Sequence, residues 1–265
     1  MNSHLASLLR PLEQAAVAVS GGVDSMTLAT LVHRLLGAER VTMIHAVSPA
    51  VPPEASARVR DYAVREGWRL VTLDAGEFAD PDYLRNPVNR CYFCKTNLYG
   101  AMAHATSRPL LSGTNLDDLG EYRPGLNAAR EHGVRHPFVE AEIGKAGVRE
   151  LARALGLEDV AELPSSPCLS SRVETLIAIE PEILKAIHAV EGLVGRRLTP
   201  KTVRCRVRRA AVVIELDPEA LAAADPAARV ALCVEIANLL PPALASRPVG
   251  FEGYRNGGAF VGARL

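Results

Sequence analysis

Apolar and polar positions along the first 155 residues follow two alternating patterns. Short apolar runs at residues 15–19, 41–47, 69–73 and 110–112 predict buried strands. Apolar residues at helical spacing predict helices over 5–12, from a cap at Asp24 or Ser25 to Gly37, and over 54–65, 91–105 and 148–155. Strands that alternate with helices in this way predict an α/β fold with a parallel sheet covered on both faces.

The pattern changes at a Pro- and Ser-rich loop, residues 162–168. Beyond this loop the spacing predicts a helix over 181–194, strands over 202–208 and 212–216, a helix over 227–239 and a glycine-rich tail strand. Asp217 and Glu219 are typical of a helix start. The chain is therefore predicted to form two domains, 1–160 with the parallel sheet and 161–265 with a smaller α+β unit, with the Cys168 loop at the junction.

Composition indicates a globular protein, because 48% of the 265 residues are hydrophobic and 23% are charged. The formal net charge is +0, so binding to nucleic acid would need a local basic patch. No run approaches the ~18–20 apolar residues of a membrane span, and no signal-type segment opens the chain, so we expect a cytoplasmic protein without a membrane partner. Five cysteines do not suggest a disulfide framework, and the closely spaced Cys91 and Cys94 favour metal or catalytic chemistry.

The strongest local signal is the hexapeptide Ser20-Gly21-Gly22-Val23-Asp24-Ser25, between a predicted buried strand and a helix. Glycines let backbone N–H groups approach an anion, and a helix N-terminus adds partial positive charge, so this segment can cradle phosphate. Asp24 can orient Mg²⁺ beside the phosphates. An ordinary glycine turn with a Ser or Asp cap is the alternative. Neither a GxxxxGK[ST] loop nor a GxGxxG segment occurs, which argues against kinases, GTPases and ordinary dehydrogenases.

This hexapeptide resembles the pyrophosphatase loop of the PP-loop ATP-pyrophosphatase superfamily. The resemblance implies MgATP cleavage between the α- and β-phosphates, with Asp24 and Ser25 as catalytic residues and Ser20, Gly21 and Gly22 binding the nucleotide. It also implies that adenine lies against Val47 and Ser48. The segment 113–118, with Gly113 and Asn115, is similar to a superfamily segment at the carboxyl edge of the sheet, where open α/β sheets bind ligands.

Further segments resemble LarE-type sulfur transferases, which prepare the thiocarboxylates of the nickel-pincer nucleotide cofactor. These segments are 86–95, 122–125, 167–172 and 252–255. The resemblance implies that Cys168 supplies sulfur, either by becoming dehydroalanine or by helping to hold an iron–sulfur cluster. It also implies that the C-terminal domain serves substrate binding and oligomerisation. After Arg172 the chain departs from the Ile-Pro-Tyr-Gly turn of many such sequences, which leaves the acceptor open.

Cys91 and Cys94 are three residues apart, so their thiols share one side of a predicted helix. With Cys168 they make three candidate ligands for a 4Fe-4S cluster with one open iron, as the three-cysteine LarE-like proteins imply. The alternatives are a structural zinc site, which needs a fourth ligand, and buried core thiols. Cys205 and Cys233 are predicted to be core residues, the latter on a helical face with Val230 and Ala237.

Arg204, Arg206 and Arg208 alternate on one face of a predicted strand, within a segment, 196–209, of seven basic and no acidic residues. Such guanidiniums repel one another unless anions bind them, and Arg suits phosphate recognition. The LarE resemblance implies that Arg204 and Arg206, with Arg172, contact substrate phosphate. A solvated basic face and an RNA-binding patch remain alternatives.

The sequence therefore predicts an ATP-dependent sulfur transferase that adenylylates a carboxylate of a pyridinium-type mononucleotide. Its expected partners are a phosphorylated small-molecule acceptor, a sulfur donor and further copies of the chain. A PP-loop enzyme that thiolates tRNA and a non-catalytic ATP-binding module are the alternatives. An ammonia-using ligase would not explain the three cysteines.

Overall fold

A computed structural model describes residues 3–120, 123–165, 167–255 and 257–259. The chain forms two compact units. Of the described residues, the first unit contains 3–80, 89–120 and 123–165, and the second contains 81–88, 167–255 and 257–259. The sequence placed the boundary at residue 160 and did not anticipate that 81–88 would belong to the second unit.

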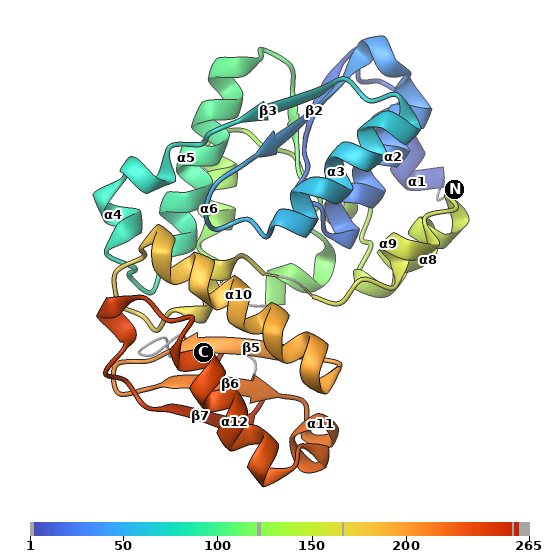
Figure 1. The fold of residues 1–265 in the computed structure, drawn as a ribbon. Coiled ribbons are helices and arrows are strands. Elements are labelled where there is room, and N and C mark those ends of the chain that lie inside the picture. Colours follow the sequence, from blue (N-terminus) through green and yellow to red (C-terminus); the bar gives the residue numbers. More distant parts are fainter. Residues whose placement is uncertain (1–2, 121–122, 166, 256, 260–265) are drawn as a thin grey trace. The chain divides into compact units, whose positions relative to one another are not determined.

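The first unit is built around a parallel four-stranded sheet in the order β3-β2-β1-β4, which confirms the predicted α/β class (Figure 1). Its strands are β1 (Ala15–Ala18), β2 (Val41–Ala46), β3 (Leu70–Leu73) and β4 (Leu110–Leu111). The expected helices are α1 (Ser3–Leu9), α2 (Val23–Leu36), α3 (Pro53–Glu66), α5 (Arg90–Ala105) and α8 (Lys145–Ala154). Three further helices, α6 (Gly125–Glu131), α7 (Pro137–Glu140) and α9 (Glu158–Ala161), were not predicted because each has at most two turns.

Successive residues of each strand point to opposite faces of the sheet, and each face has its own core. In β1, Val17 packs into the cluster with α1, α2, α3 and α8, whereas Ala16 packs into the cluster with α5 and α6. Met43 and Ile44 of β2 divide in the same way. Helices therefore cover both faces, as predicted, and β1 and β4 are apolar throughout because helices cover both of their faces.

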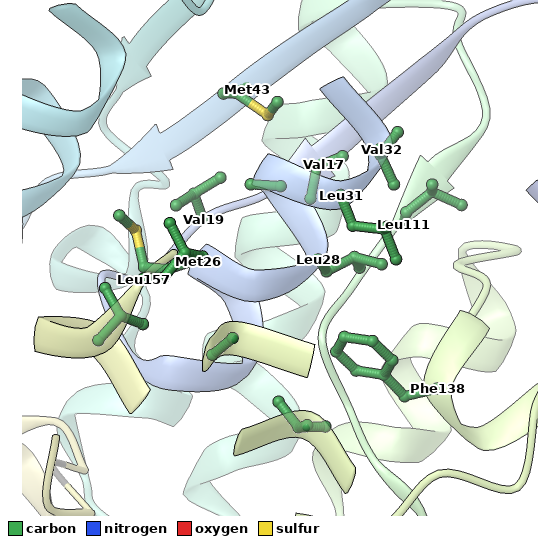
Figure 2. Close-up of a cluster of buried hydrophobic side chains, with 14 of the residues drawn as sticks. Val17, Val19, Met26, Leu28, Leu31, Val32, Met43, Leu111, Phe138 and Leu157 are labelled. Carbon is green, nitrogen blue, oxygen red and sulfur yellow. The ribbon is translucent and has the colours of Figure 1, made fainter. Parts of the chain in front are cut away.

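Helix α2 is the central helix of the larger core (Figure 2). Met26, Leu28 and Leu31 are at most 3% exposed and pack with Phe138 and Leu157, which come from the far part of the same unit. This packing fixes the N-terminus of α2 next to the loop that follows β1. The predicted cap was wrong: the N-cap is Gly22, and Asp24 and Ser25 lie inside the first turn.

The second unit has a three-stranded sheet in the order β5-β6-β7, with β5 antiparallel and β7 parallel to β6. Its strands are β5 (Val203–Val207), β6 (Val212–Leu216) and β7 (Val249–Gly253). Its helices are α4 (Pro81–Leu84), α10 (Pro181–Leu198), α11 (Pro218–Ala223) and α12 (Pro226–Ala237), with a 3-10 turn, η4 (Leu169–Arg172). Asp217 caps α11 by accepting the N–H of Ala220, which confirms the predicted helix start.

The two cysteines that were predicted to be core residues differ. Cys205 is fully buried, as expected. Cys233 is only partly buried, and Val230, on its predicted apolar face, is 68% exposed. The buried face of α12 is formed by Leu232 and Ile236 instead. Each lies one position before a residue of the expected face, Cys233 or Ala237, so the helix is rotated by about one residue from the predicted orientation.

Among the described residues, no helix is long and apolar enough to cross a membrane.

Candidate functional site

The loop between β1 and α2 is held in one conformation by close packing. Gly21 has φ +82°, and a Cβ there would lie 2.6 Å from the carbonyl oxygen of Ala55 on α3. Arg58, one helical turn along α3, donates from Nη1 to the Gly21 carbonyl at 2.7 Å. Only glycine meets both requirements, so the backbone of this loop is fixed where α2 begins.

Two serines close the loop on itself. The backbone N–H of Ser20 donates to Ser25 Oγ at 3.0 Å, and the two hydroxyl oxygens also lie 3.0 Å apart. Ser25 in turn donates to the Gly22 carbonyl at 3.1 Å. The loop therefore folds around the first turn of α2, where backbone N–H groups and the helix dipole favour an anion.

Asp24 is the acidic residue of this turn, and its two oxygens have different partners. Oδ1 accepts from Asn115 Nδ2 at 3.2 Å, and Oδ2 lies 2.5 Å from Lys145 Nζ. The Asp24 side chain is 26% exposed, so it remains accessible to a ligand. The carboxylate is thus aimed by an amide from the loop after β4 and by an ammonium group from the start of α8.

The loop after β4 packs directly on the start of α2. A Cβ on Gly113 would lie 2.7 Å from the carbonyl carbon of Asp24 and 2.8 Å from the backbone nitrogen of Ser25. Two residues later, Asn115 is fully buried, and its N–H donates to Asp118 Oδ2 at 3.1 Å. The structure therefore brings the predicted residues Gly113 and Asn115 against the predicted hexapeptide at one edge of the sheet.

Lys145 belongs to this site and was not predicted. Its Nζ pairs with Asp24, and its backbone N–H donates to Asp117 Oδ2 at 2.8 Å. The lysine lies 121 positions from Asp24 along the chain, and a single lysine at a helix start carries no local motif. The acidic run at 117–118 was the available signal, since carboxylates beside a predicted anion site need cations.

The predicted adenine contact, Val47 and Ser48, follows β2 directly. Val47 is 43% exposed although it directly follows a buried strand. Just before it, His45 is buried, and burial lowers the pKa of its imidazole. The neutral ring donates from Nδ1 to the Val19 carbonyl at 2.7 Å and accepts at Nε2 from Ser56 Oγ at 2.8 Å. His45 thus ties the strand end that precedes the hexapeptide to α3.

Cys91 and Cys94 belong to the first unit, whereas Cys168 belongs to the second. Cys91 and Cys94 lie in the first turns of α5, each partly buried. Cys168 belongs to the second unit, where it is the N-cap of η4 and is also partly buried. Across the described parts of the chain, no group of three or more His, Cys, Asp or Glu side chains is placed to hold a metal ion. The iron–sulfur cluster therefore stays a prediction.

The basic strand β5 has anionic partners that the sequence did not reveal. Arg206 is 4% exposed and pairs through Nε with Glu215 of β6 at 2.8 Å. Arg208 pairs with Glu215 at 3.0 Å and with Glu252 of β7 at 2.9 Å. Cross-strand carboxylates, which local sequence cannot show, thus neutralise most of this row.

Arg204 is in a different environment from its neighbours. It is partly buried, with its guanidinium carbon 5.9 Å from the centre of the Tyr254 ring, and its Nη1 donates to the Val203 carbonyl at 2.7 Å. Burial lowers the pKa of Arg204, and the positive charge of Arg172 adds to this effect. An anion at this position would relieve both effects.

Arg172 is the last residue of η4, the 3-10 turn that begins at the N-cap Cys168. Its side chain is 3% exposed and makes a two-point ion pair with Glu191 of α10, with nitrogen–oxygen distances of 3.0 and 3.1 Å. Among the residues predicted to contact phosphate, Arg172 and Arg206 are therefore buried in ion pairs.

Comparison with protein-family models finds no match. Among curated proteins, an uncharacterized protein of Synechocystis sp. is 39% identical over 217 residues, 78% of each chain. The pyridinium-3,5-bisthiocarboxylic acid mononucleotide synthase of Lactiplantibacillus plantarum is 30% identical over 220 residues, 82% of this chain and 79% of that protein. One component of the glutamine-hydrolyzing GMP synthase of Methanopyrus kandleri is 27% identical over 201 residues, 68% of this chain and 62% of that protein. With the glycine loop, Asp24 and the parallel sheet in place, these similarities show that the chain belongs to the LarE family of the PP-loop superfamily.

Proposed function

We propose that this chain is an ATP-dependent sulfur transferase that converts a carboxylate of a pyridinium mononucleotide into a thiocarboxylate. The observation that carries the proposal is the Asp24 carboxylate, aimed by Asn115 and Lys145 beside a glycine loop at a helix N-terminus. The related synthase of L. plantarum is named for a product with two thiocarboxylic groups on a pyridinium ring, so the matching acceptor is the 3,5-dicarboxylic acid mononucleotide.

The first stage is adenylylation. A carboxylate oxygen of the acceptor attacks the α-phosphorus of ATP, and the bond from that phosphorus to pyrophosphate breaks. The step is needed because a bare carboxylate would have to expel oxide, whereas an acyl adenylate expels AMP. The N–H groups at Gly21 and Gly22 and the start of α2 bind the phosphates, and preorganised donors of this kind stabilise developing charge.

Asp24 fits a magnesium ligand, because Mg²⁺ is commonly held by one or two carboxylates together with substrate phosphates. When bound, the ion would offset charge on the phosphates. Lys145 holds Asp24 Oδ2 and keeps a positive charge beside the phosphate site. Adenine would lie against the exposed side chain of Val47 and the backbone of Ser48.

The second stage is sulfur transfer through Cys168. Its thiolate attacks the acyl carbon, and AMP leaves with the former carboxylate oxygen. Removal of the Cα proton of Cys168 then breaks its Cβ–S bond, which leaves dehydroalanine and the thiocarboxylate. In the other form of this proposal, Cys91, Cys94 and Cys168 would hold a 4Fe-4S cluster, which would supply sulfide in place of the Cys168 thiol.

Arg204 is the residue that we assign to the acceptor phosphate. It is the predicted phosphate contact whose guanidinium is only partly buried, and its environment favours an anion. The neutralised row beside it weakens the tRNA alternative, since Arg206 and Arg208 already pair with Glu215 and Glu252. Assembly into a homo-oligomer stays an expectation.

The function is tested with ATP and pyridinium-3,5-dicarboxylic acid mononucleotide, by measuring pyrophosphate, AMP and thiocarboxylate. We expect the wild-type protein to form all three, Asp24→Asn to form none, and Cys168→Ala to release pyrophosphate without forming thiocarboxylate. Cys233→Ala is the matched cysteine control and should behave like wild type. Binding of ATP with no pyrophosphate release would contradict the proposal and favour the non-catalytic module.

The sulfur source is tested by iron and acid-labile sulfide content after anaerobic purification. About four irons per chain, lost in Cys91→Ala, Cys94→Ala and Cys168→Ala, would support the cluster. Absence of iron after anaerobic reconstitution would support Cys168 as a sacrificial donor.

A further inference from the structure

The backbone at Cys168 is held by a buried guanidinium. Nη1 of Arg172 donates to the Pro167 carbonyl at 2.6 Å and to the Cys168 carbonyl at 3.2 Å. The Cys168 carbonyl also accepts the N–H of Ser171 at 3.0 Å, which closes the 3-10 turn. The peptide units on both sides of the Cys168 Cα are therefore fixed by one side chain.

Glu191 anchors this guanidinium to the rest of the second unit. Its two oxygens accept from Nε and Nη2 of Arg172, and Oε1 also accepts the N–H of Cys205 in β5 at 2.9 Å. The Cys168 turn is thus connected through Arg172 to α10 and to the first strand of the sheet. A planar guanidinium suits this role because its donors form a rigid fork.

Neighbouring contacts hold the same turn from other sides. Arg206 Nη1 donates to the Ser171 carbonyl at 3.0 Å. The hydroxyl groups of Tyr83 and Ser170 lie 2.7 Å apart, both buried. The residues after Cys168 are accordingly rigid, whereas the Cys168 side chain itself is partly exposed.

We infer that Arg172 is a positioning residue that sets where the Cys168 thiol points, and that it does not bind the acceptor phosphate. Nε, Nη1 and Nη2 of Arg172 all donate to protein oxygens, and Glu191 balances its charge. Thiol placement matters because a misplacement of 1 Å at a reacting centre can cost about 100-fold in rate. This inference rests on the proposed function, in which Cys168 carries the sulfur.

The test compares Arg172→Gln with Arg204→Gln, which makes the same change at the guanidinium assigned to phosphate. Alkylation of Cys168 by iodoacetamide is followed by mass spectrometry, with Cys91 of the other unit as internal reference, and inorganic phosphate binding is measured by calorimetry. We expect Arg172→Gln to speed alkylation of Cys168 at least about tenfold, because hydrogen bonds to a charged donor are lost, while phosphate affinity stays within about twofold. Arg204→Gln should instead leave the rate of Cys168 alkylation unchanged and weaken phosphate binding.

A second readout separates positioning from a general loss of structure. Arg172→Gln should release pyrophosphate at the wild-type rate but form thiocarboxylate at least about tenfold more slowly. If Arg172→Gln does not fold, Arg172→Lys keeps the charge but loses the fork, and the same split should appear at about threefold.

The inference is overturned if Arg172→Gln, or Arg172→Lys in its place, leaves Cys168 alkylation unchanged, or weakens phosphate binding as much as Arg204→Gln. Failure of the proposed function has a different signature, namely normal thiocarboxylate formation by Cys168→Ala. The alkylation assay needs no turnover, so the two failures are distinguishable.

Discussion

The substitution Gly113→Ala tests how closely the loop after β4 approaches the start of α2. The added Cβ would meet three backbone atoms of Asp24 and Ser25 at 2.7, 2.8 and 2.9 Å. Contacts at ordinary van der Waals distance begin near 3.4 Å, so the two segments must separate by several tenths of an ångström. All three atoms are backbone, so no flexible side chain can yield.

Two magnitudes follow from this geometry. Overpacking of this kind typically costs about 1–3 kcal/mol of stability. For a protein of this size that corresponds to a fall in Tm of about 2–4 °C for each kcal/mol. The substitution also has a functional cost, because the shift moves Asn115 away from Asp24, and a displacement approaching 1 Å at a catalytic group can cost about 100-fold in rate.

The assay measures Tm by calorimetry and acceptor-dependent pyrophosphate release in the same preparations. Gly195→Ala is the matched control, because Gly195 lies inside α10 with no atom within 4 Å of an added Cβ. That substitution should stabilise the protein by about 0.5–1 kcal/mol and leave pyrophosphate release unchanged. If Gly113→Ala behaves like Gly195→Ala, the close packing of the loop on α2 is refuted.

Other expected outcomes concern single side chains. Lys145→Met should lower pyrophosphate release at least about tenfold, because Asp24 loses its ammonium partner and the phosphate site loses a cation; unchanged kcat and KM would remove Lys145 from the site. Arg204→Ala should weaken acceptor binding about tenfold or more and leave ATP affinity nearly intact, and equal loss of both in titrations would contradict the assigned roles. Burial and the hydrogen bond to Asp159 raise the pKa of Tyr62 to about 12, so the folded state favours the neutral phenol and loses this stabilisation as pH rises from about 10 to 12. Denaturant unfolding across this pH range should show a smaller fall in stability for Tyr62→Phe, and an identical fall would show that Tyr62 does not titrate this way.

The parallel sheet could be predicted because its signals are local. Strand β2 and helix α2 each carry their pattern within 14 residues or fewer, and the hexapeptide 20–25 lies between two such segments. A strand that is buried on both faces is mostly apolar, and glycines at its end let backbone N–H groups approach an anion. Gly113 and Asn115 were predicted from the resemblance of segment 113–118 to the PP-loop superfamily, and the rule that open α/β sheets bind ligands at their carboxyl edge supported that prediction.

Side-chain partners could not be predicted in the same way. Lys145 reaches Asp24 across 121 positions, and Glu191 reaches Arg172 from a separate helix. The basic row of β5 suggested a bare anion site because Glu215, its partner on β6, faces it only after the strands pair. Charge balance within a fold depends on tertiary neighbours, which one sequence does not identify.

The central claim, adenylylation of a carboxylate before sulfur transfer, is tested most directly by isotope transfer. The acceptor pyridinium-3,5-dicarboxylic acid mononucleotide is labelled with ¹⁸O in its carboxylates, and AMP and pyrophosphate are analysed by mass spectrometry after reaction with unlabelled ATP. The account predicts one ¹⁸O atom in each AMP and none in pyrophosphate, because the attacking carboxylate oxygen leaves with the phosphorus. Thiocarboxylate formed with unlabelled AMP, or with ADP in its place, would contradict it.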